Sequence, residues 1–244
     1  MASDKAIKTR QSILDAAKAI IIEEGIGALT MERAATKAGI SKGACMYHFK
    51  SKRALQAALV EEYAAHLSSE LARHEALFDG PPEETLVPGF IEWFRSFDHD
   101  NHGWSTVGLA IHSNFVHDEE LMRPVKLWYE RLHARIAALP EDVRTPALVA
   151  IMAIEGFFYS HKFEVDLVSP KLKIQAWHFI LENLVHNHAA AQTKHSLEWV
   201  FFSKLYEQRL FLHRRDTTKR IRKYPAPIID ANVPAGICAG AIST

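Results

Sequence analysis

The sequence has few cysteines and no long apolar run. Its two cysteines, Cys45 and Cys238, suggest no disulfide framework, and a reducing compartment fits them. No stretch approaches the ~18 consecutive apolar residues of a membrane-spanning helix. The N-terminus also lacks the charged-then-apolar pattern of a signal peptide. These absences predict a soluble, cytoplasmic protein.

Motifs of enzymes and metal sites are missing as well. The sequence shows no glycine-rich phosphate loop, nucleophile elbow or closely spaced set of zinc ligands. His99, His102, His112 and His117 could offer imidazole to a metal, but a polar turn accounts for the first pair. We therefore expect no catalytic residues, no cofactor and no metal site, and keep an enzyme only as a remote alternative.

Charge, by contrast, is present and unevenly distributed. The 244 residues carry 29 basic and 29 acidic side chains, a formal net charge of zero. Residues 1–55 hold ten Lys or Arg against five Asp or Glu, and residues 204–223 hold eight against two. Because the rest of the chain is acidic, this pattern is typical of a protein that meets phosphate at one end.

Apolar residues recur at helical spacing along most of the chain, without the alternation of strands. Two short helices are expected after Thr30 and Ser41, which suit N-caps, and a longer one at 52–75 after Ser51. The other helices are expected at 5–24, 84–98, 104–117, 119–138, 145–167 and 171–190. The prediction is an all-α fold.

The two short helices, joined at Ala38-Gly39-Ile40, form a helix-turn-helix unit. In such units the start of the second helix reaches base edges in the major groove of DNA. Small residues there, Gly43 and Ala44, allow a close approach of the backbone. Positive charge for phosphate contacts surrounds them at Lys42, Lys50, Lys52 and Arg53.

About 50 residues of this region resemble the N-terminal domain of TetR-family regulators. The likeness rests on Thr9-Arg10, Ile13 to Ala17, Glu24-Gly25, Thr30-Met31, Ala38 to Gly43 and His48 to Leu55. It implies that DNA is contacted by Thr30, Met31, Lys42, Gly43, Ala44, Met46, Tyr47, His48 and Lys52. Ala44 and Met46 depart from the family, which usually has a polar residue and an aromatic at these places, so the resemblance does not predict the target sequence.

The same resemblance implies three parts. Residues 1–55 form the helix-turn-helix DNA-binding domain, with the helix at 52–75 linking it to an effector-binding and dimerisation domain at 56–190. The clearest break in the chain is Asp79-Gly80-Pro81-Pro82. Residues 191–244 form a C-terminal extension, a basic helix and then an irregular tail. That extension is a solvated helix end, an arm that contacts DNA or a partner, or a non-native addition.

Large aromatics with a few polar groups among them describe a ligand pocket, although they also describe an ordinary helical core. The predicted pocket residues are Trp93, Phe97, Trp104, His112, Phe115 and Trp128. The resemblance implies a homodimer that pairs through the last two helices of the body. The interface residues predicted there are Ile154, Phe157, Phe158, Trp177, Leu181 and Leu184.

These predictions combine into one function. A homodimer binds a palindromic double-stranded DNA operator and represses transcription until a small apolar or aromatic effector releases it. The alternative is a DNA-binding dimer without a small-molecule effector, controlled by a partner protein.

Overall fold

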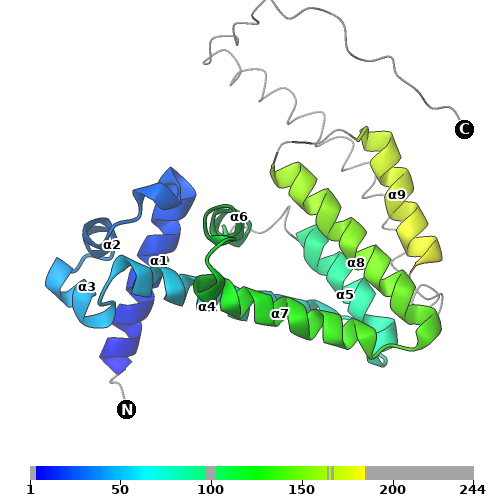
Figure 1. The fold of residues 1–244 in the computed structure, drawn as a ribbon, viewed down its shortest axis with the longest axis horizontal. Coiled ribbons are helices and arrows are strands. Elements are labelled where there is room, and N and C mark those ends of the chain that lie inside the picture. Colours follow the sequence, from blue (N-terminus) through cyan, green and yellow to red (C-terminus); the bar gives the residue numbers. More distant parts are fainter. Residues whose placement is uncertain (1–3, 97–102, 164, 166–167, 185–244) are drawn as a thin grey trace, which may run out of the picture. The chain divides into compact units, whose positions relative to one another are not determined.

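The structure, a computed structural model, describes residues 4–96, 103–163, 165 and 168–184 (Figure 1). All regular elements in these residues are helices, which confirms the all-α prediction. They are α1 (Asp4–Glu24), the 3-10 helix η1 (Ile26–Ala28), α2 (Met31–Lys37), α3 (Lys42–His48), α4 (Lys52–Glu75), α5 (Pro82–Ser96), α6 (Trp104–Phe115), α7 (Glu119–Ala137), α8 (Glu141–Lys162) and α9 (Pro170–Asn183). The chain separates into units 1–194 and 195–244, and the predicted C-terminal extension lies outside the described residues.

The predicted bounds are correct for α4 and wrong for α8. Helix α8 begins at Glu141, four residues before the predicted start. Glu141 and Asp142 occupy its first turn, where carboxylates favour the positive end of the helix dipole. The helix ends at Lys162, short of the predicted residue 167. The short helix η1 was not predicted.

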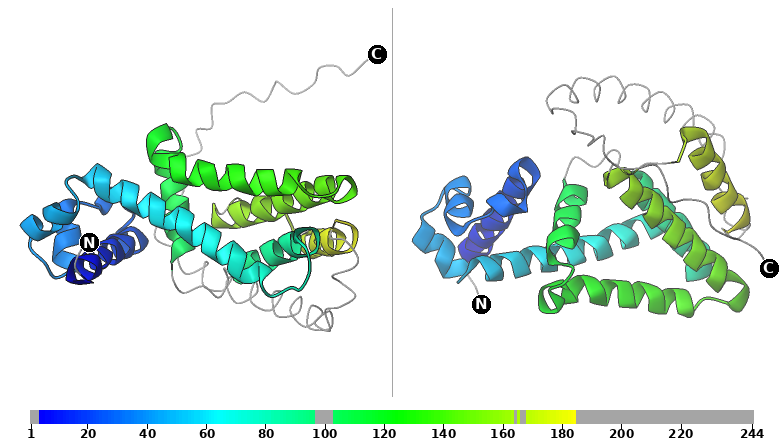
Figure 2. Two further views of the ribbon diagram at one scale, coloured as in Figure 1. Left: turned by 90° about the horizontal axis from the view of Figure 1, so that it is seen from below. Right: turned by 45° about the horizontal axis from the view of Figure 1, so that its top comes forward.

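The N-terminal helices share one apolar core with the helices that follow them. Ile13, Leu14 and Ile20 of α1 are buried, together with Leu55 and Leu59 of α4. The same cluster continues into α6 and α7 through Val107, Ile111, Leu121, Met122 and Val125. Because α4 contacts α1 as well as α5 and α7, one continuous helix joins the two regions (Figure 2).

Further buried side chains lie on α5, α7 and α8. Phe90 and Ile91 of α5, Leu132 of α7 and Ile151 of α8 are all at most 2% exposed. Helix α5 packs against both α4 and α8. Burial of such large side chains stabilises each by roughly 1.5–3 kcal/mol, so this layer holds the body of the chain together.

Helix α6 approaches α4 closely at Gly108. A Cβ atom at this position would overlap with the Tyr63 hydroxyl oxygen, closer than any van der Waals contact allows. Glycine therefore lets α6 pack directly on the Tyr63 side chain. Trp104 lies one turn earlier on α6, and the centroid of its ring lies 6.0 Å from that of the Tyr63 ring.

Candidate nucleic-acid interface and internal cavity

Hydrogen bonds between residues close in sequence fix where the helices of the predicted helix-turn-helix begin. The side-chain oxygens of Thr30, Ser41 and Ser51 each accept a hydrogen bond from the backbone N–H three residues later, at 3.1 Å. All three predicted N-caps are confirmed. They begin α2, α3 and α4 at fixed residues.

The turn between α2 and α3 is also set locally. Gly39 has φ of +69°, a left-handed conformation that glycine adopts without steric cost. Its N–H donates to the Thr36 carbonyl, and the Ile40 N–H donates to the Ala35 carbonyl. This pair of bonds is a Schellman motif, which ends α2 and turns the chain into α3.

Helix α3 has one buried and one exposed face. Cys45 is fully buried and Phe49 nearly so, and both belong to the core shared with α1. Gly43, Ala44, Met46 and Tyr47 are exposed. Tyr47, at 73% exposure, projects furthest into solvent, with the half-buried His48 ring edge-on to it at 5.3 Å. Burial raises the pKa of the Cys45 thiol, which fits a core residue rather than a reactive one.

Basic side chains flank this exposed face. The Lys42 ammonium pairs with Glu32 of α2 and holds the pKa of that carboxyl below its usual range. Lys50 Nζ lies 5.5 Å from the centroid of the Tyr47 ring. Lys52 is exposed at the first position of α4. The exposed face therefore has a cationic border, and in that respect suits a polyanion.

Arg53, also expected near phosphate, is engaged with the body of the chain instead. Its guanidinium donates to both carboxylate oxygens of Asp118, at 2.5 and 3.1 Å, and to Glu120 at 2.8 Å. The bond from Arg53 lowers the pKa of Asp118 to about 2. Because Asp118 is the N-cap of α7, this cluster ties the start of α4 to the start of α7.

Two of the predicted DNA contacts have roles inside the fold. The side chain of Met31, at 9% exposure, lies in the apolar core, so its assignment as a contact through the side chain is corrected. The Thr30 hydroxyl is the N-cap of α2. Lys42, Gly43, Ala44, Met46, Tyr47 and Lys52 lie on the surface, as a contact requires.

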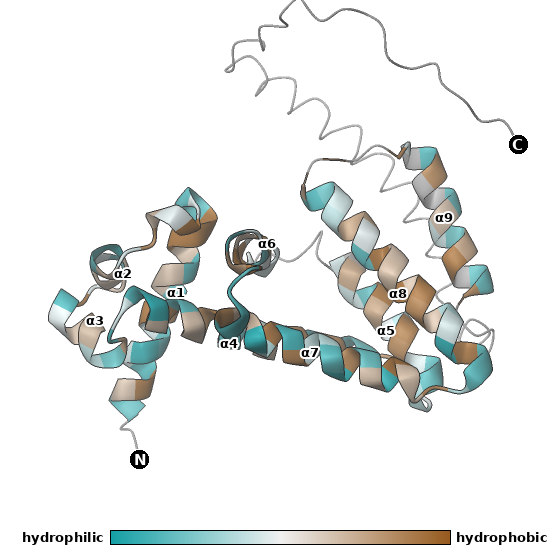
Figure 3. Cartoon of the chain, viewed as in Figure 1, coloured by the Kyte–Doolittle hydropathy of each residue, from teal (hydrophilic) through white to brown (hydrophobic). Residues whose placement is uncertain are grey.

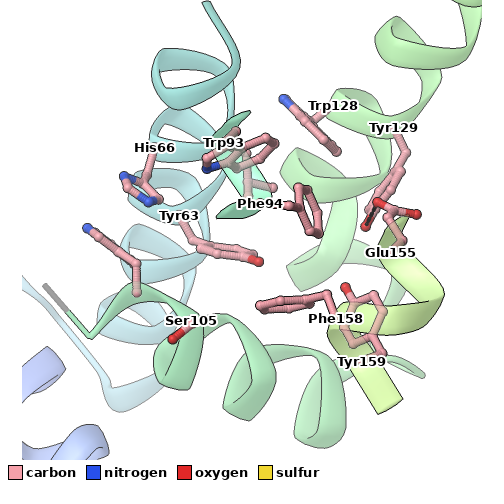
Figure 4. Close-up of a pocket in the computed structure, with 12 residues that line it drawn as sticks. Tyr63, His66, Trp93, Phe94, Ser105, Trp128, Tyr129, Glu155, Phe158 and Tyr159 are labelled. Atoms are coloured by element: carbon pink, nitrogen blue, oxygen red, sulfur yellow. Dashed lines mark hydrogen bonds between the residues drawn. The ribbon is translucent and has the colours of Figure 1, made fainter. Parts of the chain in front are cut away.

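A small cavity of about 20 Å³ lies inside the body, between α4, α5, α6, α7 and α8 (Figure 4). That volume is enough for about one water molecule. Aromatic rings make up most of the wall. The lining residues are Tyr63, His66, Leu67, Trp93, Phe94, Trp104, Ser105, Trp128, Tyr129, Glu155, Phe158 and Tyr159.

Glu155 is the carboxylate of this cavity. The Tyr129 hydroxyl donates a hydrogen bond to its Oε1 at 3.1 Å. Burial raises the pKa of Glu155 to about 7, against the opposing effect of that hydrogen bond. Burial, with the nearby carboxylate, also raises the pKa of Tyr63, Tyr129 and Tyr159. The cavity thus combines apolar walls with one titratable acid.

The predicted pocket residues divide into three groups. Trp93, Trp104 and Trp128 line the cavity. His112 and Phe115 are not among the lining residues. The His112 Nδ1 is hydrogen-bonded to the Gly108 carbonyl, and Phe115 packs against the N-terminal core. Phe97 lies outside the described residues. Phe158, predicted for a dimer interface, lines the cavity, and the centroid of its ring lies 5.3 Å from that of Phe94.

The lining residues that sequence reasoning missed follow a helical period. Tyr63, His66 and Leu67 stand at i, i+3 and i+4 on α4. Glu155, Phe158 and Tyr159 have the same spacing on α8. Each set forms one face of its helix. The sequence shows this spacing, but it does not show which helix faces pack together.

Trp104 connects the cavity to the N-terminal helices. Its ring stacks on the His66 ring, with the two centroids 5.0 Å apart. On α1, Lys18 Nζ lies 4.7 Å from the centroid of the same ring. Lys18 is held there by Asp15 at 2.8 Å and Glu62 at 2.9 Å. A side chain that lines the cavity therefore touches the first helix of the helix-turn-helix region.

Hydrophobic and hydrophilic residues alternate along α8 and α9 (Figure 3), and several of the hydrophobic side chains are exposed. Leu148, Val149 and Met152 of α8 are exposed, as are Leu172 and Phe179 of α9. Of the predicted interface residues, Ile154 is fully buried within the chain, which corrects that assignment. The rings of Phe157 and Trp177 pack together with their centroids 5.7 Å apart. Both residues are half-buried, as is Leu184. The side chain of Leu181 lies outside what the structure describes.

Two kinds of feature are absent from the described part of the chain. Its helices include none with the length and apolarity to cross a membrane. Its His, Cys, Asp and Glu side chains form no group of three that could hold a metal ion. His99 and His102 lie outside the described residues.

Comparisons with known proteins agree with the helix-turn-helix assignment. Residues 13–59 match the model of the bacterial regulatory proteins of the tetR family. The transcriptional repressor AcnR of Corynebacterium efficiens is 28% identical over 119 residues, 48% of this chain and 56% of AcnR. The chain thus spans about half the length of this curated relative.

Solved structures of the same fold cover more of the chain. A TetR-family member from Streptomyces coelicolor A3 aligns with 64% of this chain and 88% of its own, with TM-score 0.55 and 22% identity. The SmeT–triclosan complex aligns with 66% of this chain and 83% of its own, with TM-score 0.51 and 24% identity. Residues 13–59 therefore match the helix-turn-helix region of the tetR family, and the likeness to the solved structures shows that the chain shares their fold.

Proposed function

We propose that the protein is a transcriptional regulator that binds double-stranded DNA through α3. The observation that carries this proposal is the exposed face of α3, with Gly43, Ala44 and Tyr47 outward and Cys45 buried behind them. A helix anchored in this way can enter a major groove as a rigid unit. Its small first residues allow the backbone to approach the base pairs.

The contacts divide by chemistry. Lys42, Lys50 and Lys52 are the proposed phosphate contacts, because an ammonium group neutralises phosphate whatever the base sequence. Ala44 and Tyr47 are proposed to read bases, with the Ala44 methyl group suited to a thymine methyl. Thr30 and His48 complete the border, the first through the N-terminus of α2.

We also propose a homodimer that pairs through the exposed faces of α8 and α9. Leu148, Val149, Met152 and Phe179 are exposed and would lose contact with water there, and the burial of exposed apolar side chains favours association. A two-fold axis between the subunits would place two α3 helices on a palindromic operator, one helical turn (~34 Å) or a multiple apart. The function proposed for the bound dimer is repression, the activity named for AcnR.

The cavity is the proposed site of a small effector that releases the DNA. SmeT, of the same fold, was solved with a small molecule, triclosan. Because the cavity holds only about one water molecule, an effector must move the aromatic side chains that close it. Trp104 would carry that movement to Lys18 and α1. Release follows only if the effector binds the DNA-free arrangement more tightly than the DNA-bound one.

Selection from a random pool of duplex DNA tests the central proposal. The full chain is expected to enrich a palindrome whose half-sites are separated by about one helical turn. A variant with Tyr47→Ala is expected to enrich a different sequence or a degenerate one. If the unmodified chain enriched no palindrome, the proposed operator binding by a dimer would be wrong.

A further inference from the structure

Glu32 places a negative charge beside the exposed face of α3. It lies in the first turn of α2, and its side chain is 58% exposed. Its carboxylate forms an ion pair with the ammonium group of Lys42, the first residue of α3. Hydrogen bonds from Lys42, from the backbone N–H of Glu32 itself and from the Thr30 hydroxyl hold the pKa of Glu32 below its ordinary value. The carboxylate is therefore ionised at neutral pH.

The other two proposed phosphate contacts differ from Lys42 in this respect. Lys50 and Lys52 are exposed, and neither forms an ion pair with an acidic side chain of the described residues. Lys50 lies near the Tyr47 ring instead. The cationic border of α3 is thus neutralised where the helix begins, and it keeps its full charge between the end of α3 and the start of α4.

The position of α3 does not depend on the ion pair between Glu32 and Lys42. Cys45 anchors the helix in the core, and the turn at Gly39 sets its direction. An ion pair between exposed side chains contributes little to folding and is screened by salt. A phosphate group can therefore displace the carboxylate from Lys42 while the two helices stay in place.

We propose that Glu32 is an internal competitor of the DNA phosphates, which occupies Lys42 in the free protein and lowers its affinity for every duplex. This proposal rests on the proposed binding of DNA through α3. A phosphate that reaches Lys42 displaces the carboxylate, which then stays beside the DNA as an uncompensated negative charge. Because phosphate contacts carry no sequence information, the competitor limits the binding of unrelated DNA as well as that of the operator.

Glu32→Gln tests the proposal, because it removes the charge and keeps the size of the side chain. Binding of the full chain to the selected operator and to a duplex of random sequence is titrated over a range of salt concentrations. We expect both duplexes to bind about fivefold more tightly near 0.1 M salt, with an unchanged preference between them. The salt dependence should become steeper by roughly one phosphate contact, so the gain shrinks as the salt concentration rises.

Lys42→Gln tests whether the competition acts through this lysine. It should cost more affinity in the Glu32→Gln background, where the lysine has no internal partner, than in the unmodified chain. Equal losses in the two backgrounds would contradict the proposed competition for Lys42. Glu130→Gln is the control for net charge, since it removes the same charge from an exposed position of α7. It should leave the affinity for both duplexes unchanged.

The two other roles open to Glu32 predict different results. Weaker binding by Glu32→Gln would show that the ion pair holds Lys42 ready for DNA, and a changed sequence preference would show that Glu32 reads a base. Either result, or an unchanged affinity, would overturn the proposal and leave the DNA-binding function standing. If the unmodified chain bound neither duplex, the proposed DNA binding would fail together with it.

Discussion

The ammonium group of Lys18 on α1 lies 4.7 Å from the centroid of the Trp104 ring on α6, over one face of a ring whose atoms also line the cavity. Lys18 is 16% exposed. Burial acts to lower its pKa, but hydrogen bonds to Asp15 and Glu62 outweigh it and raise the pKa, so Lys18 stays charged. The pair joins the DNA-binding region to the cavity by a cation–π contact.

This contact can be measured as a coupling energy. The free energy of unfolding is compared for the unmodified chain, Lys18→Met, Trp104→Leu and the double variant. We expect a coupling of about 1 kcal/mol, the range of a partly desolvated cation–π pair. Lys18→Met with Trp93→Leu is the control cycle and should show additive effects. If the effects of Lys18→Met and Trp104→Leu on the free energy of unfolding were additive, the contact would contribute no coupling energy.

Lys52 offers the clearest test of the phosphate contacts. Lys52→Ala should weaken binding to every DNA sequence alike and reduce the salt dependence by roughly one phosphate contact. Titrations of operator and unrelated duplex over a range of salt concentrations measure both effects. Lys126→Ala on α7, also an exposed lysine, is the control and should change neither. A changed sequence preference in Lys52→Ala would show that Lys52 reads bases.

Local features of this fold were predictable from the sequence, because their causes lie within a few residues. Thr30, Ser41 and Ser51 cap helices through bonds to residues three positions later, and Gly39 ends α2 through its own φ. The bounds of α4 were predicted correctly for the same reason, because local capping sets where that helix begins. Capping residues and glycine act on their own turn of helix whatever the rest of the chain does.

The cavity could not be predicted to the same degree, since its walls come from five helices. The aromatic-rich segment indicated Trp93, Trp104 and Trp128, but not Glu155 of α8. In α8, apolar residues occur on several sides. Buried Ile154 and exposed Val149 therefore look alike in the sequence. Only the packing of α5 and α7 on α8 decides which side is covered.

The dimer interface is tested by a charge on the exposed face of α8. Val149→Glu should shift the chain toward the monomer, because a carboxylate buried in an apolar interface costs several kcal/mol unless it is paired. Sedimentation at several protein concentrations measures the shift. Leu127→Glu places the same charge at an exposed apolar residue of α7 and should leave the assembly unchanged. A Val149→Glu variant that associates like the unmodified chain would place the interface elsewhere.

Glu155 should make stability depend on pH in a direction opposite to that of an ion-paired carboxylate. Burial raises its folded-state pKa from an ordinary 4.5 to about 7. The folded chain therefore holds the proton more tightly than the unfolded chain. The stability from this group is fully present below about pH 4.5 and is lost as the pH rises through 7, up to about 3 kcal/mol in all.

The measurement is the difference in unfolding free energy between the unmodified chain and Glu155→Gln from acid to mildly alkaline pH. The two should be of similar stability in acid, and the glutamine variant should be the more stable above pH 7, since it has no carboxyl to ionise. Glu130→Gln should show no such trend. A constant difference across the range would mean that Glu155 keeps an ordinary pKa.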